Sequence, residues 1–142
     1  MKNKKLEILT WYVGENLYGL FLKDCKEVIK NVEILPIPHS KNYISGILNL
    51  RGEIITVLDA VVKLGYPKES IRGKKSIIRL KEKSKVSIVA DKIYDIIEIS
   101  SDRLENPPSN LSDRELKCIE KVVNSDQGAI VILNLNGITE IE

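Results

Sequence analysis

The sequence predicts an all-β fold made of two small β-barrels packed together, with short helices. Short runs rich in Ile, Val, Leu and Thr recur along the chain and are bounded by Gly, Asn, Asp or Lys, which is typical of strands joined by turns. The second half also repeats the order of the first. A chain of 142 residues holds one average domain, so we expect a single domain, residues 1–142, built from two similar halves.

The first half is expected to contain two hairpins. The strands of the first are residues 8–13 and 17–22, and those of the second are residues 44–50 and 54–58. The first pair is joined at Gly14-Glu15-Asn16 and the second at Arg51-Gly52-Glu53. Each connection contains a glycine, which supplies the positive φ that tight turns need.

One short helical segment is predicted between these hairpins. Cys25, Val28 and Ile29 fall at positions i, i+3 and i+4, while the residues between them are polar, and this spacing forms one face of a helix. Two prolines within residues 35–38 then interrupt regular structure, because proline lacks the backbone N–H that helices and sheets require.

The predicted repeat relates residues 8–65 to residues 76–138. A shift of about 68 residues places apolar residues on apolar ones and acids on acids. It aligns Tyr18, Leu20, Phe21, Cys25, Glu27, Val28 and Ile29 with Val86, Ile88, Val89, Ile93, Asp95, Ile96 and Ile97. A further hairpin is expected from residues 119–133, with its turn at 125–128. Asp59 is expected to cap a short helix, and Asn134 is its counterpart.

Composition and motif content argue against catalysis. The formal net charge is +2, and the single histidine, His39, follows a proline in a loop. The spacings of metal sites, phosphate-binding loops and catalytic triads are missing, so we expect no enzyme activity, no catalytic residue, no metal and no cofactor. Cys25 and Cys118 stand far apart in apolar patterns, which is typical of buried thiols in a reducing compartment. A bilayer-spanning apolar run is also missing, so a cytoplasmic protein is expected.

The strongest signal for nucleic-acid binding lies in residues 72–85. This segment contains one acid, Glu82, and seven basic residues: Arg72, Lys74, Lys75, Arg79, Lys81, Lys83 and Lys85. Apolar residues alternate with the charges, and no aromatic residue is present to stack on bases. An exposed strand guarded by lysines is therefore favoured. We expect no nucleic-acid partner, and a nucleic-acid-binding small barrel stays the alternative.

The turn Asn49-Leu50-Arg51-Gly52 is not explained by folding alone. Arg51 follows an apolar strand, and Glu27 lies just past the first hairpin, where a neighbouring element would present it. A guanidinium offers several donors in a rigid fork. A pair between Arg51 and Glu27 at the margin of a barrel would therefore fix a docking geometry.

At these residues the sequence resembles the CheW family, the coupling proteins of bacterial chemotaxis. The resemblance runs from Ile8 to about Ile138, and its most specific part is residues 43–59, YISGILNLRGEIITVLD. This segment is similar to the family's pattern of a tyrosine, a glycine, an NLRG turn and an apolar strand ending in aspartate. Thr56 and Ala60 depart from it, where proline and leucine are usual. The resemblance implies two SH3-like five-stranded barrels packed together, and no catalytic activity.

The resemblance also implies the partners. Family members bridge the cytoplasmic tips of methyl-accepting chemoreceptors to the regulatory domain of the histidine kinase CheA, which has the same fold. A cytoplasmic adaptor recruited to membrane-associated receptor arrays, with no direct membrane insertion, is therefore expected. Because the sequence ends at Glu142, a fused receiver domain is not expected. Related adaptors serve twitching, gliding and gene regulation, and these pathways stay open as alternatives.

The resemblance places receptor binding on five positions. Arg51 matches the arginine of the receptor-facing surface, and Glu27 matches its acidic neighbour. Gly46 matches a position that allows close approach. Cys25 and Val28 match apolar positions that line the same region. The resemblance assigns no named residues to kinase binding.

Overall fold

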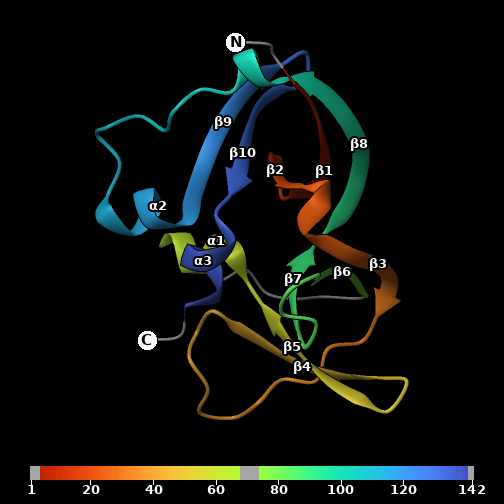
Figure 1. The fold of residues 1–142 in the computed structure, drawn as a ribbon. Coiled ribbons are helices and arrows are strands. Elements are labelled where there is room, and N and C mark those ends of the chain that lie inside the picture. The colour runs from red at the N-terminus through yellow and green to blue at the C-terminus, as the bar shows by residue number, and fades with distance from the viewer. Residues whose placement is uncertain (1–3, 68–73, 141–142) are drawn as a thin grey trace.

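Two five-stranded β-sheets form the framework of the protein (Figure 1). The computed structural model describes residues 4–67 and 74–140. The strands are β1 (Lys5–Val13), β2 (Asn16–Phe21), β3 (Cys25–Val32), β4 (Ile44–Leu50), β5 (Glu53–Leu58), β6 (Lys75–Leu80), β7 (Val86–Ala90), β8 (Lys92–Ser100), β9 (Ile119–Ser125) and β10 (Gly128–Leu133). The helices are η1 (Leu22–Asp24), α1 (Ala60–Leu64), η2 (Ser101–Arg103), α2 (Asp113–Cys118) and α3 (Leu135–Thr139). These elements confirm the predicted all-β class with short helices.

Each sheet takes strands from both halves of the chain. The strand orders are β8-β1-β2-β10-β9 and β3-β6-β7-β5-β4. Strands β1 to β5 of the first half correspond in order to β6 to β10 of the second half. Replacing each strand of the first sheet with its counterpart, β1 with β6 and β8 with β3 for example, gives the strand order of the second sheet. The two parallel pairs, β2 with β10 and β7 with β5, obey the same relation. The halves are therefore interwoven, and the division at residues 8–65 and 76–138 describes the sequence repeat and not the two sheets.

The hairpins form where turn chemistry predicts them, but with shorter loops. The closing pairs of the three connections are Val13 with Asn16, Leu50 with Glu53, and Ser125 with Gly128. Each loop therefore has two residues, the commonest length of a hairpin connection.

The predicted helical segment at Cys25, Val28 and Ile29 is wrong, because these residues lie in strand β3. Val28 packs against the apolar cluster between the sheets, whereas Ile29 packs against a separate cluster of the second sheet. Adjacent side chains on opposite faces are the property of a strand. The register of β3 shifts between Cys25 and Glu27. Cys25 and Val28 therefore pack against the same cluster although they are three positions apart, which is also the spacing of one helix face.

The predicted caps begin two of the helices. The Asp59 carboxylate accepts hydrogen bonds from the backbone N–H groups of Val61 and Val62 at the start of α1, and Asn134 accepts one from Gly137 in α3. The sequence interpretation missed α2, which Ser112 begins with a capping box. The three helices gather on one side of the molecule, between the two sheets (Figure 1).

Three apolar clusters hold the framework together. The largest lies between the sheets and includes Trp11, Leu20, Ile78 and Ile88. The second belongs to the first sheet and includes Ile8, Leu17 and Ile132, and the third belongs to the second sheet and includes Ile55, Val57 and Ile77. The joint cluster shows that the sheets bury a face against each other, which two units this small need for stability.

A single backbone bridge draws the opposite edges of each sheet together. In the second sheet, Leu35 follows β3 and pairs with Ile47 on β4. In the first sheet, Glu105 follows β8 and pairs with Val122 on β9. The bridges cover part of the edge strands. In the second sheet, the bridge between Leu35 and Ile47 brings β4 and the β4–β5 turn towards β3.

Candidate functional site

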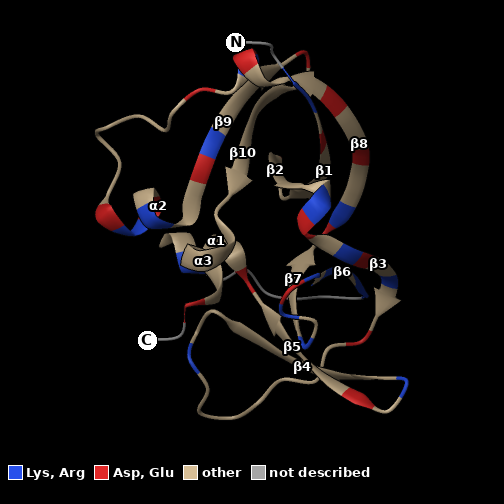
Figure 2. Ribbon diagram, viewed as in Figure 1, with Lys and Arg blue, Asp and Glu red and all other residues tan. Residues whose placement is uncertain are grey.

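The β4–β5 turn presents Arg51 at its tip. Arg51 and Gly52 both have positive φ values, 50° and 86°, as a type I′ hairpin turn requires. The Asn49 side chain accepts a 3.0 Å hydrogen bond from the Gly52 backbone N–H, which fixes the turn. The Arg51 side chain remains 67% exposed. Figure 2 shows opposite charges next to each other at this end of the hairpin.

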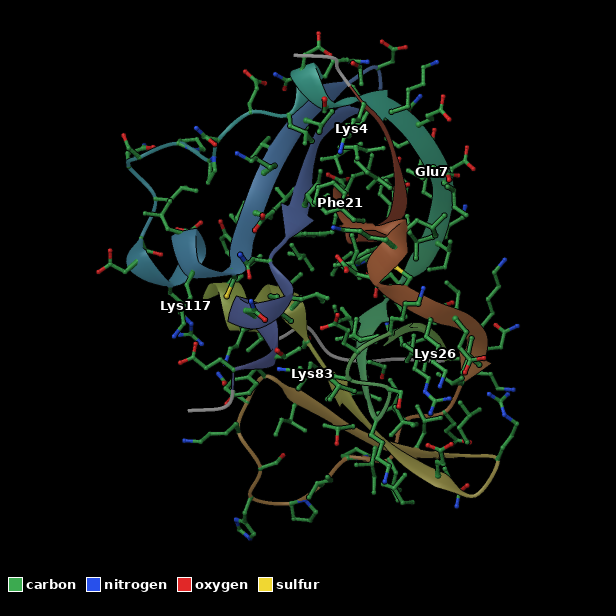
Figure 3. The ribbon with its side chains drawn as sticks, viewed as in Figure 1. Lys4, Glu7, Phe21, Lys26, Lys83 and Lys117 are labelled. Carbon is green, nitrogen blue, oxygen red and sulfur yellow. The ribbon has the colours of Figure 1, made fainter. Side chains whose placement is uncertain are left out.

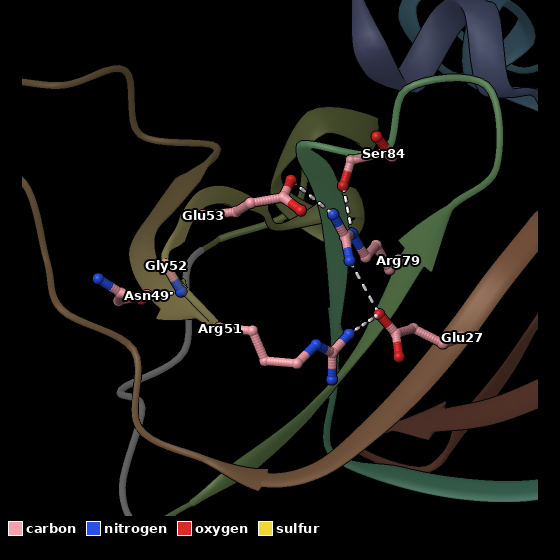
Figure 4. A network of polar contacts seen from close by, with 7 residues as sticks. All are labelled: Glu27, Asn49, Arg51, Gly52, Glu53, Arg79 and Ser84. Carbon is pink, nitrogen blue, oxygen red and sulfur yellow. Dashed lines mark hydrogen bonds and ion pairs between the residues drawn. The ribbon is translucent and has the colours of Figure 1, made fainter.

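Arg51 contacts Glu27 on β3, as the sequence predicts. Its Nη2 lies 2.9 Å from Glu27 Oε1. The same oxygen accepts a second hydrogen bond, also 2.9 Å, from Nη1 of Arg79 on β6. Arg79 continues to Glu53 on β5 through Nη2, at 3.0 Å, and its Nε donates to the Ser84 carbonyl (Figure 4). Two arginines and two glutamates therefore form one network across β3, β5, β6 and the β4–β5 turn.

The network combines a buried cation with a solvent-facing one. The Arg79 side chain is 3% exposed, the Glu27 side chain 29% and the Glu53 side chain 49%. The hydrogen bond from Arg79 is the largest of the effects that lower the pKa of Glu27, and the charge and hydrogen bond of Arg51 add to it against the opposing effect of burial. Glu27 is therefore a carboxylate at neutral pH, held between two guanidinium groups.

The other residues that the resemblance assigns to receptor binding lie on β3 and β4. Gly46 is buried on β4, and a Cβ atom there would lie 2.3 Å from the Leu35 carbonyl oxygen. The close approach that Gly46 permits is thus to the protein's own backbone. Cys25 and Val28 are half-buried and pack against the cluster between the sheets. Burial raises the pKa of the Cys25 thiol to about 12, with a smaller contribution from Asp24.

Sequence reasoning missed Arg79 and Glu53 as members of the site. Arg79 counted only as one of the basic residues of segment 72–85, and Glu53 as part of a turn. A signal was available, because Arg79 interrupts a strand whose neighbours Ile78 and Leu80 are fully apolar. A charge in such a strand is rarely buried without a partner.

Several of the basic residues in segment 72–85 are engaged within the protein. Lys75 pairs with Asp91 at 2.7 Å, and Arg79 belongs to the network above. Lys83 donates to the Thr139 hydroxyl at 2.8 Å and lies beside α3 (Figure 3). Lys81 and Lys85 are exposed, while Arg72 lies outside the described residues. Lys74 is exposed as well, so the cations of this segment divide between internal contacts and solvent.

Apolar side chains are exposed near the turn and on the edge strand of the other sheet. Leu35 is 65% exposed and Ile54 is 52% exposed, and Ile54 lies opposite Asn49 in the hairpin. On β8, Tyr94 and Ile96 are also exposed. Exposed apolar residues beside a rigid charged group are typical of protein–protein contact surfaces.

Neither clustered metal ligands nor a membrane-spanning helix is found among the described residues. Across residues 4–67 and 74–140, no group of three or more His, Cys, Asp or Glu residues could hold a metal ion. In the same ranges, none of the helices has the length and apolar character needed to cross a membrane. His39 is exposed in a loop.

Comparisons with known proteins place the chain among adaptors. The family model of the CheW-like domain matches residues 7–142. Chemotaxis protein CheW of Treponema pallidum is 26% identical over 141 residues, which cover 96% of this chain and 83% of the relative. Chemotaxis protein CheW of Thermotoga maritima is 26% identical over 137 residues, covering 96% and 89%. The crystal structure of scaffolding protein TtCheW from Thermoanaerobacter tengcongensis matches with a TM-score of 0.83 and 30% identity, covering 98% of this chain and 95% of that one.

Proposed function

Since the chain belongs to the CheW-like domain family, whose members are chemotaxis adaptors, we propose that it couples chemoreceptors to the histidine kinase CheA. The protein acts as a scaffold in this proposal and catalyses no reaction. One surface takes the cytoplasmic tip of a methyl-accepting receptor, and a second face pairs with the regulatory domain of the kinase. The place of action is the cytoplasmic side of membrane-associated receptor arrays.

The receptor surface is centred on Arg51 and Glu27 in this proposal. The observation that carries it is an exposed guanidinium whose position is fixed, at 2.9 Å, by a carboxylate that a buried arginine also holds. A charged group with one fixed orientation selects the register of a partner helix. Cys25 and Val28 are half-buried on β3 and pack against the cluster between the sheets, and in this proposal the parts of them that stay accessible add apolar contact area. Gly46 lets the β4 backbone approach Leu35 closely.

Signal transfer needs no chemistry at this surface. A receptor in its two signalling states offers two arrangements of its tip. An adaptor that binds one arrangement more tightly shifts the equilibrium towards it, by as much as the two binding free energies differ. The kinase bound to the second face then responds to the change in the populations of the two arrangements.

Charge reversal at Arg51 tests the receptor surface. We expect Arg51→Glu to weaken binding of a soluble receptor tip by at least about tenfold, because it places two carboxylates together and removes a central contact. The fold should survive, since an exposed ion pair contributes only about 0–1 kcal/mol. Isothermal titration calorimetry measures the binding, and thermal unfolding checks the fold.

Lys4→Glu is the matched control. It makes the same charge change at an exposed lysine just before β1 of the other sheet, far from the turn (Figure 3), and should bind as the unmodified protein does. Equal binding by Arg51→Glu and Lys4→Glu would contradict the proposed surface. Reconstituted kinase phosphorylation, with and without this protein, tests the coupling itself.

A further inference from the structure

Arg79 is the most deeply buried charge of the site. It is the penultimate residue of β6, between Ile78 and Leu80, which are 0% and 1% exposed, and is itself 3% exposed. A buried cation is costly unless it is paired and hydrogen-bonded. Its partners should therefore explain why a charge stands in this strand.

Those partners come from three separate segments. Arg79 Nη1 donates to Glu27 on β3, Nη2 donates to Glu53 on β5, and Nε donates to the Ser84 carbonyl in the β6–β7 connection. The planar fork is engaged on both edges, so the guanidinium cannot rotate without losing two or more contacts. Glu27 lies directly opposite Arg79 in the β3–β6 register. Arg79 therefore holds the Glu27 carboxylate in one position.

The two carboxylate oxygens of Glu27 differ in their hydrogen bonds. Oε1 accepts from both Arg79 and Arg51 (Figure 4). No hydrogen bond from another described residue reaches Oε2 of Glu27. An oxygen of a half-exposed carboxylate that is already oriented can accept from an incoming donor without a further loss of side-chain entropy.

We propose that Arg79 is the positioning residue of the docking surface: it fixes the Glu27 carboxylate, so that Oε1 orients Arg51 and Oε2 accepts from an amide or cationic donor of the receptor segment. This inference rests on the proposed receptor-binding function. Arg79 does not touch the partner, because it is buried. Its effect on binding passes through Glu27.

A double-mutant cycle tests this route. The variants are Arg79→Met, Glu27→Gln and the pair combined, with binding of the receptor tip measured by calorimetry. Each single change should weaken binding by about tenfold. The combined variant should be within about twofold of Glu27→Gln alone. If Arg79 acts on binding only through Glu27, replacing Arg79 has no further effect once Glu27 has been replaced. Additive losses would overturn the proposal, since Arg79 would then act by another path.

Two further variants control the cycle. Lys81→Met removes an exposed cation directly after the same strand and should leave binding unchanged. Arg79→Lys keeps the charge but loses the fork. If Arg79→Met does not fold, Arg79→Lys replaces it in the cycle, with a smaller expected loss and the same required non-additivity.

A second measurement does not depend on the receptor. The pKa of the Glu27 carboxyl, followed by NMR through its side-chain carbon, should rise in Arg79→Met and also in Arg51→Met, because both arginines lower it. These two arginines are the cations that face Glu27, from β6 and from the β4–β5 turn. An unchanged pKa in Arg79→Met would overturn the positioning role even if receptor binding is real. Absence of binding by the unmodified protein would instead reject the proposed function and leave this titration decisive for Arg79.

Discussion

Replacement of Gly46 by alanine separates a folding role from a docking role at this position. An added Cβ would lie 2.3 Å from the Leu35 carbonyl oxygen and 2.8 Å from a methyl carbon of Ile34. The backbone φ of Gly46 is also +152°, a value that residues with a side chain rarely adopt. The variant must therefore displace the segment that crosses β4.

The size of the effect follows from three contributions. Displacement by about 1 Å breaks the two hydrogen bonds between Leu35 and Ile47, which are 2.8 and 2.9 Å long, at a net cost of about 2 kcal/mol. Backbone strain adds about 1–3 kcal/mol, and crowding of Ile34 adds about 1 kcal/mol or more. We expect a loss of about 4–6 kcal/mol, a large part of the typical 5–15 kcal/mol stability of a domain.

Urea unfolding of Gly46→Ala and Gly52→Ala measures this difference. Gly52 is the matched control, because its φ is +86° but nothing lies within 4 Å of an added Cβ. It should lose only about 1 kcal/mol from strain. Equal losses at the two glycines would refute the steric argument. Weak receptor binding by a Gly46→Ala protein of unchanged stability would instead favour direct contact with the partner.

Two other predictions follow from the pKa shifts. The pKa of Glu27 is lowered in the folded protein, so its contribution is present above the unfolded value, about 4.3, and is lost as pH falls through the folded value. Urea midpoints from pH 7 to pH 3 should therefore fall less steeply in Arg79→Met, and an equal decline would contradict the pairing. Burial raises the pKa of Cys25 to about 12, so native protein at pH 8 should react slowly with iodoacetamide and rapidly only in urea. Fast labelling of Cys25 in native protein would show that the thiol is not shielded.

The local features of the fold were predictable because their causes are local. Turn residues and alternating apolar runs define the hairpins, and the caps at Asp59 and Asn134 need only the residues that follow them. The contact between Arg51 and Glu27 was predictable from the turn and from the position of an acid after the first hairpin.

The features that were missed depend on distant parts of the chain. Strand β3 has an apolar spacing that fits a helix, and only the two clusters on its opposite faces make it a strand. The role of Arg79 depends on a register that places residue 79 opposite residue 27, which are 52 positions apart. No local pattern contains that information.

The all-β class, the hairpins, the caps and the family could be predicted from the amino-acid sequence, because each follows from neighbouring residues or from a contiguous motif. The exchange of strands between the two halves and the buried arginine that anchors the exposed pair are visible only in the packed fold. Strand pairing and charge burial are settled by which surfaces meet when the whole chain is packed, since the free energy of both depends on partners far away in sequence.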